Sequence, residues 1–290
     1  MKSIVYYSKN ISPEYVLKLY NLLEANLTGK TAVKVHTGEV GNQNFIKPVF
    51  WKPVIDAVSG VVVECNTAYH GERDSTDKHL RTIALHGWND LYNVDLLDAE
   101  GPDAVLPVKN GLRITKNYVG KNLLDYDSLL VLSHFKGHPM GGYGGALKQL
   151  SIGCASSKGK SYIHGAGTIQ PFPPKVVREH FLESMADAAS SVVEMFKGKA
   201  AYINVMMNLS VDCDCCAKAE NPCMKNIGIL ASLDPVAIDQ ACIDFIYKAT
   251  DDPGQAHFLE RLESLNGIHT VEAAEQLCVG TRNYEIINID

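Results

Sequence analysis

Short apolar runs alternate with amphipathic stretches along most of this chain, and each such pair predicts a strand followed by a helix. The first pair is Lys2 to Tyr7 and the helix that begins after Ser12. The segments Val61 to Cys65 and Ser128 to Leu132 are compact apolar runs, typical of buried strands. Regular alternation of this kind predicts an α/β fold, with a mixed, largely parallel sheet and helices on both faces.

The remaining elements continue this alternation. Further strands are expected at 31–36, 201–209, 227–231 and 284–288, and further helices after Lys47, after Ser75, from Lys175 to Phe196 and after Asp234. An added β-hairpin is expected from Val105 to Val119, with strands 104–108 and 112–115, because Asn110-Gly111 favours a tight turn. Residues 154–174 are polar and lack periodicity, so a surface loop is expected there. No internal repeat or linker divides the chain, which favours one elaborated domain over residues 1–290.

Composition narrows the class of protein. With 290 residues, 46% of them apolar and 21% charged, the chain can form a sizeable core without disulfides. A net charge of −6 argues against nucleic acid as the main partner. No apolar run reaches the roughly 18 residues of a membrane helix, and no signal peptide is visible. A cytoplasmic protein with no membrane partner is therefore expected, while its oligomeric state stays open.

A glycine-rich stretch, Ser133 to Gly153, follows one of the predicted strands and is the strongest candidate for a ligand site. It holds two histidines, two lysines and six glycines. Backbone N–H groups in such a run can bind an anion, with lysine as a fixed positive charge. The spacing fits neither a dinucleotide fingerprint nor a P-loop, and a glycine-rich turn without a ligand is the alternative. The candidate ligand-binding residues are Lys136, Gly141, Gly142, Gly144, Gly145 and Lys148.

Two histidines of this stretch, His134 and His138, are four residues apart. Gly137 and Pro139 make a helix here unfavourable, so helical spacing does not explain the pair. The two side chains are candidates for metal ligands, for acid/base groups, or for one of each. Together with Lys148 they are the candidate catalytic residues.

The loop after the Val61 to Cys65 strand is rich in polar side chains. Asn66, Tyr69 and Arg73 are candidates for binding a carboxylate or phosphate. A helix cap at Asp74 and a solvated ion pair explain the same residues equally well.

Four of the eight cysteines, Cys213, Cys215, Cys216 and Cys223, fall close together. Clustered thiolates suit an iron–sulfur cluster or zinc, although the spacing is neither that of a zinc ribbon nor that of a ferredoxin. Free reduced thiols are the alternative. Because the carboxyl ends of parallel strands meet at one edge of a sheet, this loop, the glycine-rich stretch and the Asn66 loop are expected to share one rim.

Several of these motifs together resemble the prokaryotic family known as domain of unknown function 362. The matching segments are 66–73, Phe135 to His138, 141–148, Gly153 to Ala155, Asp212 to Cys215 and Gly228 to Ala241. Many members of that family look like iron–sulfur proteins because a ferredoxin module follows their Gly-Cys-Ala segment. The corresponding region here, Ser156 to Pro174, contains no cysteine, so a cluster would have to use the four clustered thiols.

A shorter segment, Gly144 to Lys148, is similar to the glycine-glycine-x-lysine segment of nickel-pincer lactate racemases. In those enzymes the lysine holds the cofactor and histidines handle metal and proton transfer. This resemblance implies a rim that binds an organic acid or a cofactor.

Three functional hypotheses follow. The first is a metal- or iron–sulfur-binding protein with redox chemistry, a pocket for a small anionic ligand and a redox partner protein. The second is a metal-free racemase or isomerase that acts on an organic acid through Lys148 and His134 or His138. The third is a sensor that binds the same ligand without turnover.

Overall fold

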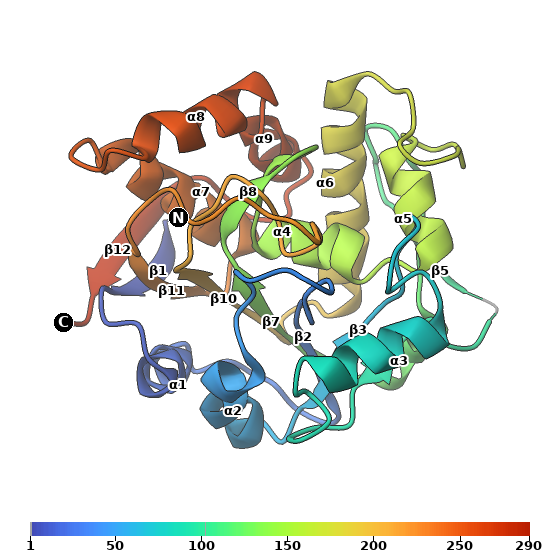
Figure 1. Ribbon diagram of the computed structural model, residues 1–290, viewed down its shortest axis with the longest axis horizontal. Helices are drawn as coiled ribbons and strands as arrows, with labels where there is room; N and C mark the ends of the chain where they lie inside the picture. Colours follow the sequence, from blue (N-terminus) through green and yellow to red (C-terminus); the bar gives the residue numbers. More distant parts are fainter. Residues whose placement is uncertain (1, 102) are drawn as a thin grey trace.

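An eight-stranded sheet forms the centre of the computed structural model, which describes residues 2–101 and 103–290 (Figure 1). The strand order is β12-β1-β11-β10-β7-β2-β3-β4. The strands are β1 (Ser3–Ser8), β2 (Thr31–Lys34), β3 (Val61–Glu64), β4 (Asp95–Leu96), β7 (Ser128–His134), β10 (Ala200–Met206), β11 (Gly228–Ser232) and β12 (Tyr284–Asn288). The predicted mixed, largely parallel sheet is confirmed.

The direction of the strands determines which loops meet at the rim of the sheet. β10, β7, β2, β3 and β4 run parallel to one another, and β1 is parallel to β12. Only β11 reverses, because it is antiparallel to both β1 and β10. The loops that follow β2, β3, β7 and β10 therefore leave the sheet at one edge, as the sequence predicts.

Helices cover both faces of the sheet. On β7, Leu129 and Val131 belong to one buried cluster and Leu130 and Leu132 to the other, as strand alternation requires. In Figure 1 one face carries α1, α2 and α3, and the other carries the later helices. The helices are α1 (Pro13–Leu22), α2 (Pro48–Ala57), α3 (Thr76–Leu85), α6 (Arg178–Met195), α7 (Pro235–Lys248), α8 (Gln255–Ser264) and α9 (Ile268–Gln276).

The predicted hairpin is present, but its turn differs. β5 (Ala104–Pro107) pairs antiparallel with β6 (Lys116–Val119). The expected tight turn at Asn110-Gly111 and the expected second strand at 112–115 are wrong. The carboxylate of Asp187 on α6 accepts hydrogen bonds from three consecutive backbone N–H groups, those of residues 112, 113 and 114, and so holds this segment as a loop.

The surface loop expected at 154–174 is also wrong in its first half, which forms helix α5 (Ser157–His164). Ser156 caps this helix by accepting a hydrogen bond from the N–H of Gly159. Ile163 packs against Phe181 and Leu182 of α6, so tertiary packing supports a helix that local composition does not favour. Helix α5 thereby lies beside α6 (Figure 1).

The glycine-rich stretch folds into short elements. β8 (Lys136–His138) and β9 (Gly142–Gly144) form a two-stranded antiparallel sheet, followed by α4 (Ala146–Lys148) and a π-helical turn (Gln149–Gly153). A short 3₁₀ helix (Lys121–Asp125) precedes β7. Within the described residues, none of the helices has the length and apolar character needed to cross a membrane.

Candidate functional site

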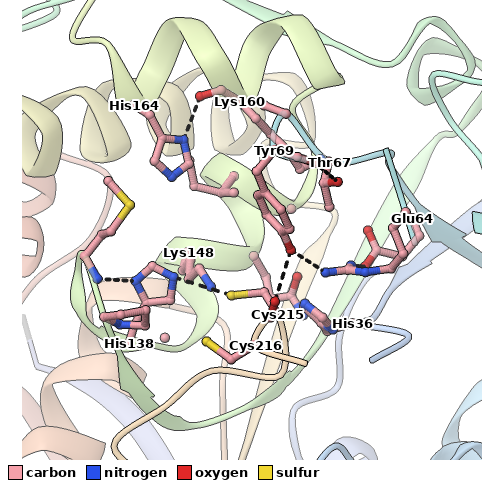
Figure 2. A pocket seen from close by; sticks show the side chains of 18 of the residues that line it. His36, Glu64, Thr67, Tyr69, His138, Lys148, Lys160, His164, Cys215 and Cys216 are labelled. Carbon is pink, nitrogen blue, oxygen red and sulfur yellow. Dashed lines mark hydrogen bonds and ion pairs between the residues drawn. The ribbon is translucent and has the colours of Figure 1, made fainter. Parts of the chain in front are cut away.

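A cavity of about 230 Å³ lies at the rim, beyond the carboxyl ends of β2, β3 and β7 (Figure 2). Its walls come from the loop after β3, from β8, α4 and α5, and from the cysteine loop (residues 207–227), which joins β10 to β11. Five cationic side chains line it, which are Lys34, Arg73, Lys136, Lys148 and Lys160. Three histidines line it as well, which are His36, His138 and His164.

One side of the cavity is a network of buried ion pairs, the paired wall (Lys34, Glu39, Glu64 and Arg73). Lys34 Nζ lies 3.1 Å from Glu64 Oε2. Arg73 Nε lies 3.2 Å from Glu39 Oε2, and Arg73 Nη1 lies 3.7 Å from Glu64 Oε1. Burial opposes the charge of Glu64, but Lys34 and the other positive groups around it bring the pKa of this carboxyl well below its usual range.

A second network fixes the base of the cysteine loop. His134 Nδ1 lies 2.9 Å and Lys136 Nζ lies 3.0 Å from the carboxylate of Asp214. Burial alone would raise the pKa of Asp214, but His134 and Lys136 hold it well below its usual range. His134 Nε2 lies 2.7 Å from the carbonyl oxygen of Met207. Since both ring nitrogens of His134 face oxygen atoms of the protein, neither nitrogen is free for a substrate.

The opposite side of the cavity, the open wall (Lys148, Lys160 and His164), is different. Lys148 Nζ lies 3.0 Å from Cys213 Sγ, and Lys160 Nζ donates to the carbonyl of Ala155 at 2.7 Å. Within residues 2–101 and 103–290, no carboxylate lies at ion-pair distance from either lysine. The cavity therefore carries positive charge that its own carboxylates do not balance.

Asp239 on α7 holds the backbone that carries Lys148. Its carboxylate accepts from the N–H of Ala146 at 2.8 Å and of Leu147 at 3.0 Å, at the start of α4. It also accepts from two neutral side chains, Tyr143 and Asn204. Burial without a cation raises the pKa of Asp239 to about 6, although these hydrogen bonds oppose the rise.

Two glycines allow these close approaches. A Cβ atom at Gly145 would lie 2.5 Å from Asp239 Oδ1. At Gly137 a Cβ would lie 2.4 Å from the carbonyl oxygen of Val211, and the Gly137 N–H donates to the carbonyl of Ser210 at 2.8 Å. The cysteine loop thus contacts β8 backbone to backbone, which only glycine permits.

Backbone hydrogen bonds fix the proton positions on the cavity histidines. His138 Nδ1 accepts from the N–H of Gly141 at 2.9 Å, so the proton of the neutral ring is on Nε2, 3.9 Å from Cys215 Sγ. His164 Nδ1 donates to the carbonyl of Lys160 at 2.7 Å, so its Nε2 has a free lone pair. In Figure 2 this nitrogen of His164 is turned toward His138 and Lys148.

Three donor atoms could hold a metal ion, since the ligand atoms of His138, Cys213 and Cys215 lie within 4.8 Å of one another. The cysteines do not form a four-thiolate set, because Cys223 Sγ donates to the carbonyl of Leu209 and is not in the group. A metal on His138 Nε2 would also require a proton on Nδ1, which now accepts a backbone hydrogen bond. The residues fit a metal ion held mainly by two thiolates better than they fit an iron–sulfur cluster.

Most of the predicted site residues meet at the cavity. Those that line it are His138, Lys148, Lys136, Gly144, Gly145, Tyr69, Arg73, Cys215 and Cys216. Cys213 lies directly behind Lys148. The others do not line it: His134 and Cys223 are engaged elsewhere, Gly141 supports the His138 ring, Gly142 packs against Gly267, and Asn66 bonds Thr76.

His36, which follows a predicted strand, lines the cavity as well, whereas the sequence did not single out four other lining residues, namely Lys34, Glu64, Lys160 and His164. Lys160 and His164 are four residues apart in what proves to be a helix, and that spacing is the one signal that pointed to a shared face. The two charged residues at the ends of β2 and β3 gave a weaker signal, because a charge closing an apolar strand is common.

Comparison with known proteins places the chain in context. A family model described as Domain of unknown function (DUF362) matches residues 31–244. No curated protein matches. Among solved structures, the lactate racemase apoprotein from Thermoanaerobacterium thermosaccharolyticum is 16% identical, with a TM-score of 0.43 over 69% of this chain and 50% of that chain. A crystal structure of a protein from Thermotoga maritima is 14% identical, with a TM-score of 0.44 over 91% of this chain and 59% of that chain.

Proposed function

We propose that this chain, which belongs to the domain of unknown function 362 family, is an enzyme that binds a small organic acid in the rim cavity and transfers a proton on it. One observation carries the proposal: Lys148 and Lys160 face a buried cavity without a carboxylate partner. A buried cation that contacts only a thiol sulfur or a carbonyl oxygen is costly, and an anionic ligand beside the two lysines lowers that cost.

Proton transfer is supported by the groups that face the same space. His138 presents an N–H, whereas His164 presents a lone pair, and the thiols of Cys215 and Cys216 line the cavity beside them. A proton donor and a proton acceptor at one bound anion are the requirement for general acid–base catalysis. Burial favours the neutral ring and lowers the pKa of both histidines, so neither is protonated before a ligand binds.

The test combines binding with exchange. Purified protein is screened against a panel of organic acids by thermal shift, and acids that stabilise it are incubated with it in D₂O while NMR follows their C–H signals. We expect the Lys148→Met variant to lose ligand-induced stabilisation, with Cys215→Ala retaining it. Lys158→Ala, at an exposed position on the same helix as Lys160, is the matched control. Stabilisation that survives in Lys148→Met and disappears in Cys215→Ala rejects the proposal.

A second candidate, metal binding, is supported by the three donor atoms of His138, Cys213 and Cys215. Protein purified without oxygen is analysed for iron, zinc and nickel. Stoichiometric metal that is lost in Cys213→Ser and Cys215→Ser but kept in Cys223→Ser supports this candidate, whereas protein without stoichiometric metal and with every thiol free rejects it.

In the organic-acid experiment, binding of an acid with no C–H exchange and no turnover favours a sensor.

A further inference from the structure

The imidazole of His164 is built into the open wall as a hydrogen-bond acceptor. Its side chain stacks on Phe181 with ring centroids 4.8 Å apart and meets Phe172 edge-on at 5.2 Å, while Nδ1 is held by the carbonyl of Lys160. These contacts fix the orientation of the ring. The residue is 6% exposed, and Nε2 has no hydrogen-bond partner within the described residues.

Nε2 is open to the cavity that His164 lines, so a ligand that donates a hydrogen bond to it binds more tightly than a ligand of the same shape that does not. Desolvation by burial lowers the pKa of His164 to about 4, and the ring is therefore neutral near pH 7. The other two cavity histidines differ, because His36 and His138 each accept a backbone hydrogen bond at Nδ1 and present an N–H at Nε2. His164 is thus the acceptor among the three.

Two positive charges act on this acceptor. Lys148 and Lys160 both oppose protonation of His164, so both lysines lie within electrostatic reach of the ring. Neither has a carboxylate partner among the described residues, and Lys160 is 7% exposed. Because neither lysine has a carboxylate at ion-pair distance, a ligand with two carboxylates supplies one to each lysine, whereas a monoanion supplies only one.

From this arrangement we propose that the cavity selects a short hydroxy-dicarboxylic acid, whose two carboxylates pair with Lys148 and Lys160 and whose hydroxyl donates to His164 Nε2. The inference rests on the proposed function and names its substrate class, and the proton that His164 accepts is then the proton of this hydroxyl. A hydroxyl fits better than an ammonium group, which would add a third positive charge beside the two lysines. The cavity of about 230 Å³ suits a ligand of few carbons, since it is smaller than most sites for drug-sized molecules.

Isothermal titration of the full-length protein with four acids tests the inference. Malate is compared with succinate, which lacks the hydroxyl, with lactate, which lacks the second carboxylate, and with aspartate, which replaces the hydroxyl by an ammonium group. We expect malate to bind about tenfold or more tightly than each of the others.

Two variants assign the preference to residues. His164→Phe keeps the stacking on Phe181 but removes the acceptor, so the malate-to-succinate ratio falls to about one. Lys160→Met keeps the apolar stem and removes the charge, so the malate-to-lactate ratio falls to about one. His164→Gln, which retains a carbonyl acceptor, restores part of the first preference. Melting temperatures of the unliganded variants check that each is folded.

The possible outcomes distinguish the substrate class from the proposed function. If wild-type protein binds several organic acids with no preference for malate, or if His164→Phe keeps the full preference, the substrate class is wrong while the proposed function stands. If wild-type protein binds no organic acid, both fall. The four-ligand comparison on wild-type protein decides the question even if a variant does not fold.

Discussion

Glu64 and Asp239 are both buried carboxylates that support the same cavity, yet they are stabilised in opposite ways. Glu64 faces the cations Lys34 and Arg73, which keep it ionised and lower its pKa. Among the described residues, Asp239 accepts hydrogen bonds from neutral donors alone, and burial raises its pKa to about 6. The first carboxylate balances charge in the paired wall. The second one positions backbone behind the open wall and leaves the charge of Lys148 to a ligand.

The comparison shows how the molecule divides the work of building the site. In the paired wall, each cation already has a carboxylate partner, so this side of the cavity does not need a charged ligand. Lys148 stays available, because Asp239 supports α4 from behind through backbone N–H groups instead of through the lysine itself. On α5, the lone pair of His164 stays available because Nδ1 is held by the carbonyl of Lys160. An anionic ligand then balances the positive charge of the lysines in the open wall.

Glu64→Gln is expected to have the largest effect. It leaves Lys34 and Arg73 with too little negative charge in a buried network, and removing one member of such a network costs about 3–5 kcal/mol of unfolding free energy. Urea denaturation at pH 7 measures the loss. Glu285→Gln, at an exposed position on β12, is the control and should change stability by less than about 0.5 kcal/mol. Equal losses of unfolding free energy in the two variants would show that the ion pairs of the paired wall do not stabilise the protein.

Asp239→Asn should cost less, about 1–3 kcal/mol, because an amide can still accept hydrogen bonds at its oxygen while its NH₂ group faces an N–H donor. The same denaturation experiment measures this loss. Since the start of α4 loses a partner, we also expect weaker binding of any acid that stabilises the wild type. Unchanged ligand binding would mean that Asp239 does not position Lys148.

The pH dependence of stability should separate the two carboxylates by sign. Asp239 has a raised pKa, so its contribution is fully present below about pH 4 and is lost as the pH rises through about 6. Glu64 has a lowered pKa, so its contribution is present above about pH 4.3 and is lost as the pH falls below that value. Subtracting each variant from wild type over pH 3.5–7.5 should give slopes of opposite sign. Slopes of the same sign would contradict the comparison.

Lys160→Met should have the smallest effect on the unliganded protein. It removes a buried charge that has no carboxylate partner, so unfolding free energy should change by less than about 1 kcal/mol or increase slightly. Differential scanning calorimetry without ligand provides the measurement. A loss as large as that of Glu64→Gln would place Lys160 in the paired wall instead of the open wall.

The sequence predicted seven of the eight strands of the sheet and its rim, but neither the short strand β4 nor the reversed direction of β11. Apolar runs identified the strands, and the parallel order of β2, β3, β7 and β10 brings their loops to one edge. For that reason Lys136, His138, Lys148 and Cys215, which were chosen only as reactive groups in loops after strands, meet in one cavity. Convergence of loops depends on parallel strand direction, which the alternation of strands and helices predicts for this part of the sheet.

Pairing and proton position could not be predicted, because they depend on register and on local backbone geometry. Lys34 meets Glu64 because β2 pairs with β3 in one particular register, with Lys34 opposite Val63. The lone pair of His164 faces the cavity because α5 forms in a segment whose composition suggests a loop, and its helical turn places the carbonyl of Lys160 under Nδ1. The composition of the two segments predicts neither the Lys34–Glu64 ion pair nor the orientation of the His164 ring.

The contact between Gly137 and Val211 gives the site a mechanical property. The cysteine loop is held on β8 without an intervening side chain, and a single added methyl group at Gly137 would meet backbone atoms that cannot rotate away. Gly137→Ala would therefore act as a wedge that lifts the thiols from the lysine side of the cavity while every charged and sulfur-bearing group remains in the chain. This one position separates the two halves of the site, so the chemistry of the lysines can be studied apart from that of the cysteines.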